Sequence, residues 1–111
     1  MALMDKTGAA ATVRKEADRF TVAVEGKPVG LTEFVDRGEQ RIFPHTQVND
    51  AFEGRGLATI VIGEALAETK AEGLRIVPVC PAVTAYVEKH PEYADVVDKP
   101  TLKLLESLRR A

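Results

Sequence analysis

Residues 41–79, with the sequence RIFPHTQVNDAFEGRGLATIVIGEALAETKAEGLRIVPV, decide the fold of this chain. We expect a strand over Arg41–Val48, a helix over Arg55–Glu72 and a second strand over Leu74–Val79. The helix is predicted because apolar side chains recur at helical spacing and Gly73 follows directly. A strand–helix–strand unit implies parallel pairing of its two strands through a right-handed crossover.

The residues before this unit, 12–48, predict an antiparallel meander. Phe20, Val22 and Val24 alternate with polar or small side chains, which is the period of a half-buried strand. Gly26 and Lys27 supply one of the turns that separate the strands. With the crossover unit, the meander predicts a mixed sheet in an α+β domain.

This domain is expected to span residues 12–111, after a flexible N-terminus over residues 1–11. Pro81 suits the first position of a helix that runs to about Lys89, and residues 101–110 predict a C-terminal helix.

Two prolines, Pro44 and Pro78, interrupt the strands of the crossover unit. Proline has no N–H group, so it breaks the ladder of hydrogen bonds where the strands should pair. Either each strand contains a bulge, or the two strands splay apart.

A glycine-containing turn, Gly54-Arg55-Gly56-Leu57-Ala58, leads into the helix of the unit. The first N–H groups of a helix lack partners within it, and the helix dipole adds positive charge there. Glycine lets a bulky anion approach the backbone closely. The turn therefore predicts a site for phosphate oxygens, with a plain connection as the alternative. It matches neither the P-loop nor the dinucleotide-binding glycine pattern.

Composition narrows the class of protein. The chain has 111 residues, which is enough for one domain. Its net charge is −2, so it lacks the excess of basic residues that is typical of proteins that bind nucleic acid. No apolar stretch reaches the ~20 residues that cross a bilayer. Cys80 is the only cysteine, which fits a cytoplasmic protein. With two distant histidines, it also argues against a metal site.

Several motifs resemble those of the GCN5-related N-acetyltransferases. Residues 53–58 resemble the family's acyl-CoA-binding signature, Gln/Arg-x-x-Gly-x-Gly/Ala, although Glu53 replaces the usual Gln or Arg. Residues 82–89 resemble the later Ala-x-x-x-Tyr-x-x-Lys helix. A small subfamily of short, stand-alone members is similar at residues 45–48, 54–58, 77–81 and 90–93.

The resemblance implies a truncated form of the family's fold, with splayed central strands that accept the pantetheine arm of acetyl-CoA. Its amides would bond to backbone at about Thr46 and Val48. The phosphates would bind at the turn, through Gly54, Arg55, Gly56, Leu57, Ala58 and Thr59, and Arg55 would assist as a charge partner.

Three residues are candidates for the chemistry. The resemblance places Tyr86 as the acid that protonates the departing thiolate; the alternative is a core tyrosine. Cys80 precedes the helix that starts at Pro81, where free N–H groups favour a thiolate, so it is an acyl relay, a pocket residue or an inert buried side chain. His45 is a candidate base. Gln47 stands where the subfamily often has Glu, so a base role moves to His45, Glu33 or water.

The predicted function is N-acetyl transfer from acetyl-CoA, without a metal, to an amine. The resemblance implies early helices that wall one side of the family's acceptor site, but the meander of this chain leaves no room for them. The acceptor site is therefore expected to be open, which favours a protein or peptide lysine. The alternative is a non-catalytic acyl-CoA-binding or interaction module. Partners such as nucleic acid and membranes are not expected, and the oligomeric state stays open.

Overall fold

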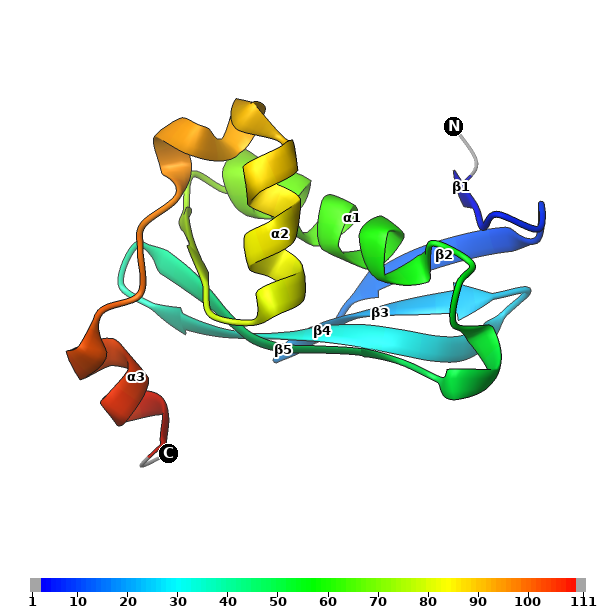
Figure 1. The fold of residues 1–111 in the computed structure, drawn as a ribbon, viewed down its shortest axis with the longest axis horizontal. Coiled ribbons are helices and arrows are strands. Elements are labelled where there is room, and N and C mark those ends of the chain that lie inside the picture. Colours follow the sequence, from blue (N-terminus) through cyan, green and yellow to red (C-terminus); the bar gives the residue numbers. More distant parts are fainter. Residues whose placement is uncertain (1–2, 110–111) are drawn as a thin grey trace.

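A computed structural model describes residues 3–109 of the chain (Figure 1). In chain order, the strands are β1 Leu3–Met4, β2 Ala10–Lys15, β3 Arg19–Val24, β4 Lys27–Arg37, β5 Gln40–Val48 and β6 Arg75–Pro78. The helices are α1 Leu57–Ala71, α2 Pro81–Lys89 and α3 Leu102–Arg109, with short 3-10 helices η1 Asp50–Phe52 and η2 Pro91–Val96. None of these helices is long and apolar enough to span a bilayer.

The strands form one six-stranded sheet in the order β1-β2-β3-β4-β5-β6. Each neighbouring pair from β1 to β5 is antiparallel, and β5 pairs with β6 in parallel. The parallel pair is joined by α1, as a strand–helix–strand unit requires. The predicted α+β class, the meander and the crossover are therefore confirmed.

The core lies between the sheet and α1. Phe20, Val22 and Val24 are buried on β3, and Val61 and Ala65 are fully buried on the facing side of α1. Figure 1 shows α1 and α2 above the sheet and α3 below it. One face of the sheet is thus covered by two helices, while the opposite face is open apart from the C-terminal helix.

The N-terminal segment differs from the flexible lead-in that its composition suggested. Residues 1–2 lie outside the described part, but residues 3–11 form β1, a turn and the start of β2. The buried carboxylate of Asp5 accepts hydrogen bonds from the backbone N–H groups of Thr7 and Ala9. Asp5 also forms an ion pair with Arg55, which ties this hairpin to the glycine turn.

The two strands of the crossover unit splay apart where the prolines predicted an interruption. Their pairing runs from Gln40 with Arg75 to Phe43 with Pro78 and ends there. The next two N–H groups, of Val79 and Cys80, both donate to the carbonyl of Phe43 at 3.2 and 2.9 Å. Beyond this point β5 continues to Val48 while β6 has ended. Bulge and splay occur together, because the β4–β5 register also shifts beside Pro44.

Candidate acyl-CoA site at the strand splay

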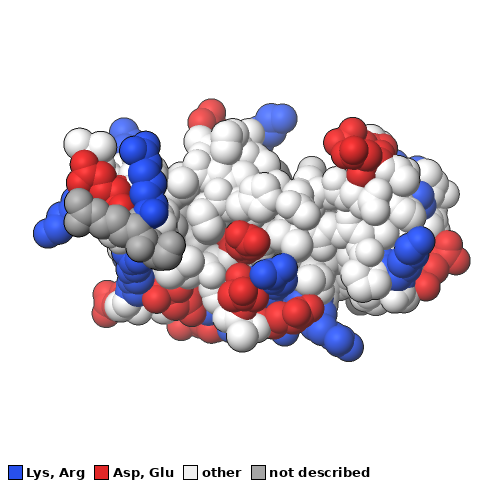
Figure 2. Space-filling view, turned by 90° about the horizontal axis from the view of Figure 1, so that it is seen from below, with Lys and Arg blue, Asp and Glu red and all other residues white. Residues whose placement is uncertain are grey.

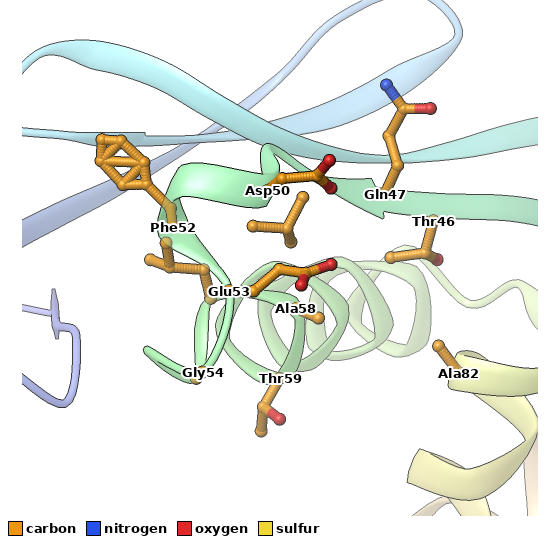
Figure 3. A pocket seen from close by; sticks show the side chains of 12 residues that line it. Thr46, Gln47, Asp50, Phe52, Glu53, Gly54, Ala58, Thr59 and Ala82 are labelled. Atoms are coloured by element: carbon orange, nitrogen blue, oxygen red, sulfur yellow. The ribbon is translucent and has the colours of Figure 1, made fainter.

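A cavity of about 480 Å³ lies beside the splay, on the face of the sheet that carries the helices. Its walls come from four places in the chain: the end of β5, the loop with η1, the glycine turn with the first residues of α1, and Ala82 at the start of α2 (Figure 3). Of the predicted cofactor-binding residues, all but Arg55 line it: Thr46, Val48, Gly54, Gly56, Leu57, Ala58 and Thr59.

The backbone of Thr46 and Val48 faces the side from which β6 is missing. The N–H of Asn49 donates to the carbonyl of Val29 at 2.7 Å, which makes Gly30 and Val48 a non-hydrogen-bonded pair in the antiparallel ladder. Pairs alternate, so Thr46 opposite Thr32 is of the same kind. The N–H and C=O groups of Thr46 and Val48 therefore point away from β4, where an extended amide chain could pair with them.

The glycine turn has the backbone shape that only glycine adopts without strain. Gly54 has φ of 80° and Gly56, the N-cap of α1, has φ of 77°. Within residues 3–109, no side chain caps the start of α1. The first N–H groups of the helix, from Leu57 to Thr59, are thus free of a side-chain acceptor and lie at the cavity, where phosphate oxygens could accept from them.

Two carboxylates share this cavity. Asp50 and Glu53 both line it (Figure 3). Asp50 was missed by sequence reasoning, because it is the first residue of η1 and matches no motif. Both carry negative charge close to the glycine turn. This charge disfavours phosphate groups within the cavity and favours them on the side of the turn that faces the N-terminal hairpin.

Arg55 points away from the cavity, toward the N-terminal hairpin. Its Nε lies 2.7 Å from Oδ2 of Asp5, and its Nη2 lies 2.6 Å from the same oxygen. The guanidinium also stacks over the Phe52 ring, 4.7 Å from its centroid. Arg55 therefore does not line this cavity, and its side chain anchors the hairpin.

Cys80 lies at the splay, as the sequence indicated. It is the buried N-cap residue of α2, and its Sγ lies 3.4 Å from Oγ1 of Thr46. Thr46 in turn exchanges a hydrogen bond of 2.9 Å with the hydroxyl of Thr32. The thiol thus contacts Thr46, which lines the cavity, although Cys80 itself does not line it.

Tyr86 lies one turn along α2 from Ala82 and faces α1. A Cβ atom at Gly63 would lie 2.8 Å from the Tyr86 hydroxyl oxygen, so the phenol occupies the space that this glycine leaves. The ring stacks on His90 with centroids 3.8 Å apart. Burial raises the pKa of Tyr86, and Tyr93, Glu92 and Glu64 add to the effect, so its phenol is protonated at neutral pH. Neither Tyr86 nor Cys80 lines the cavity.

His45 lies on the opposite, open face of the sheet. It is exposed, and its Nε2 lies 2.7 Å from Oε1 of Gln47. Its cross-strand neighbour is Glu33, the other base candidate. The structure therefore brings Cys80 and Tyr86 to the helix side and puts His45 on the other side of the same strand.

That open face has its own cavity beside the splay. It has a volume of about 260 Å³ and is lined by Pro44 and Val79 from the splayed strands and by Leu105, Leu108 and Arg109 from α3. In the described residues, no cluster of three or more His, Cys, Asp or Glu side chains could hold a metal ion.

Comparison with known proteins gives the family and the fold of the chain. A family model described as GCN5-related N-acetyl-transferase matches residues 19–96. A GCN5-like putative N-acetyltransferase from Staphylococcus aureus superposes with a TM-score of 0.62, at 17% identity, over 82% of this chain and 91% of that one. A search of curated protein sequences finds no match.

Two larger solved structures share the fold. The ribosomal-protein-S18-alanine N-acetyltransferase from Escherichia coli has a TM-score of 0.56 at 13% identity over 68% of this chain. The ribosomal-protein-alanine N-acetyltransferase from Brucella melitensis biovar Abortus 2308 has 0.51 at 22% over 75%. The chain spans only 53% and 64% of their respective lengths. On the family match and this shared fold, the chain belongs to the GCN5-related N-acetyltransferase family and is an acetyl-CoA-dependent acyltransferase.

Proposed function

We propose that this protein transfers the acetyl group of acetyl-CoA to the amine of a protein or peptide lysine. One observation carries the proposal: the unpaired backbone edge at Thr46 and Val48 and the open glycine turn line one cavity. A pantetheine arm carries amides spaced along an extended chain, and a diphosphate follows them. The cavity offers the matching groups in the same order, first a strand edge and then a helix N-terminus.

The thioester then lies at the splay, between the two faces of the sheet. Pantetheine fills the helix side, so an acceptor amine approaches from the open face. His45 is exposed there and could take a proton from an ammonium group. Tyr86, on the helix side, holds a proton at neutral pH that the departing thiolate could accept. Base and acid thus approach the reacting carbon from opposite sides.

The open face suits a macromolecular acceptor. The turns that join β2 to β5 are short, so no helix between them covers β4 and β5 on this side. Figure 2 views this face, on which acidic and basic side chains are interspersed around a broad uncharged stretch. A flexible lysine side chain can reach the splay from such a surface without a deep acceptor pocket.

Calorimetry with CoA, followed by acetyl transfer to a panel of amines and lysine peptides, tests the proposal. Native protein should bind CoA, and Gly56→Asp should lose this binding because it adds a side chain and a negative charge at a left-handed position. Tyr86→Phe should lower kcat by about 10²–10⁴-fold with little change in CoA affinity. CoA binding without transfer to any acceptor would instead indicate a non-catalytic acyl-CoA-binding module.

A further inference from the structure

The N-terminal hairpin is fastened to the glycine turn by bonds on both sides of Lys6. The N–H of Lys6 donates to the carbonyl of Arg55 at 2.9 Å. Next to it, the Asp5 carboxylate accepts from the Thr7 hydroxyl at 2.6 Å and pairs with the Arg55 guanidinium. The Thr7 hydroxyl also accepts from Nη2 of Arg55 at 3.2 Å. The turn of the hairpin is therefore held in one position against the start of α1.

This arrangement lays the Lys6 side chain along the N-cap of α1. Its Cε, Cγ and Cδ atoms lie 3.3, 3.4 and 3.7 Å from the place that a Cβ on Gly56 would occupy. The absence of a side chain at Gly56 thus makes room for the Lys6 stem. The lysine reaches the phosphate-binding turn from a segment that the matched family region, residues 19–96, does not include.

A second cavity, of about 490 Å³, lies on this side of the turn. Gly56 and Thr59 line both this cavity and the one at the splay. The two spaces therefore meet around the first turn of α1. The second is also lined by Met4, which is 61% exposed, and by Ile60, so it combines an apolar surface with charge.

The charges in the second cavity favour an anion. Asp5 and Arg55 form a close ion pair and largely cancel each other. Lys6 lies within 4.0 Å of no carboxylate oxygen in the described residues, so its ammonium group contributes net positive charge. The carboxylates of Asp50 and Glu53 line only the first cavity. Phosphate groups that pass the glycine turn thus move away from negative charge and toward Lys6.

We propose that the second cavity binds the nucleotide half of CoA, and that Lys6 contacts its phosphates. The inference rests on the proposed function, because the pantetheine half must occupy the first cavity. Met4 and Ile60 offer apolar contact to the adenine ring. Asp5 is a positioning residue: it holds Arg55 and the backbone of the hairpin so that Lys6 stays beside Gly56.

Calorimetry with three probes tests the assignment: CoA, 3′-phosphoadenosine 5′-phosphate, which lacks the pantetheine arm, and pantetheine, which lacks the nucleotide. Lys6→Ala should weaken the binding of CoA and of 3′-phosphoadenosine 5′-phosphate by a similar factor of about ten, as expected for loss of a charge-assisted contact. Pantetheine affinity should not change. Lys6→Arg should restore most of the loss, and Lys27→Ala, at the exposed start of β4, should have no effect.

The outcomes separate the two proposals. If native protein binds CoA and Lys6→Ala binds it equally well, the nucleotide assignment is wrong and the proposed function stands. If Lys6→Ala weakens the binding of pantetheine as much as that of CoA, Lys6 affects binding only by supporting the fold, and the assignment also fails. If native protein binds none of the three probes, the proposed function fails and the nucleotide site fails with it. Raising the salt concentration should reduce the effect of Lys6→Ala, because the contact is ionic.

Discussion

Replacement of Gly63 by alanine tests the position of the Tyr86 hydroxyl, on which its proposed acid role depends. The new methyl group would lie 2.8 Å from the hydroxyl oxygen and 3.4 Å from the ring carbon that bears it. The ring is restrained by its stack on His90, with centroids 3.8 Å apart. The contact must therefore be relieved by a shift of the ring or of α2.

The expected magnitude is a difference of two opposing effects. Alanine in place of glycine stabilises a helix interior by about 0.5–1 kcal/mol, whereas overpacking a close contact such as this half-buried one costs about 1–3 kcal/mol. Gly63→Ala should therefore destabilise the native protein by up to about 2.5 kcal/mol. A net loss of 1 kcal/mol lowers the Tm of a domain of this size by about 4–8 °C.

Tyr86→Phe is the matched background, because it removes the oxygen and leaves the ring. In that background Gly63→Ala should be neutral or stabilising, by up to about 1 kcal/mol. The four proteins form a double-mutant cycle, measured by urea unfolding, with an expected coupling energy of about 1–3 kcal/mol, which is the overpacking cost that Tyr86→Phe relieves. If the two substitutions add within about 0.5 kcal/mol, the hydroxyl does not lie against Gly63. Gly63→Ala should also lower kcat on a genuine acceptor while CoA affinity is kept.

Three other predictions follow from named contacts. Arg41→Ala should cost about 2–3 kcal/mol in urea unfolding, because it removes a buried side chain together with its charge-assisted hydrogen bonds to Asp36 and Glu72. Arg75→Ala, from a half-exposed pair, should cost at most about 1 kcal/mol, and equal losses would contradict the burial argument. The pKa of Asp5 is lowered to about 2, chiefly by the Thr7 hydroxyl, so its contribution to stability is present above about pH 4 and is lost as the pH falls toward 2. Asp5→Asn should therefore lose less stability than the native protein between about pH 4 and pH 2, and the same loss in both proteins would contradict this role. Cys80→Ala should change the rate only modestly, and intact-mass measurement of native protein with acetyl-CoA but no acceptor should show no acetyl adduct; an adduct that Cys80→Ala abolishes would establish a relay instead.

Much of the fold was predictable because its signals are local. Alternation along β3, the glycine after α1 and the proline at the start of α2 each act within a few residues, and the structure places the elements where these signals predicted. The interruption of the sheet was also local, since a proline removes its own N–H group. The candidate site also rests on a local signal, because a glycine turn before a helix leaves backbone N–H groups free for an anion.

The sequence alone predicted where the glycine turn and the splay lie along the chain, but it misjudged what surrounds them. Asp5 looked like part of a flexible lead-in and Arg55 like a free phosphate partner, yet the two residues, 50 positions apart, form one ion pair in which the Asp5 carboxylate is buried. His45 and Thr46 are adjacent in sequence, but a strand turns neighbouring side chains to opposite faces, and only the completed sheet decides which face the helices cover. The backbone preferences of a residue depend on its near neighbours, so the local sequence determines them. The partner of a charge and the side of a sheet depend on which distant segments pack together, and only the tertiary structure decides them.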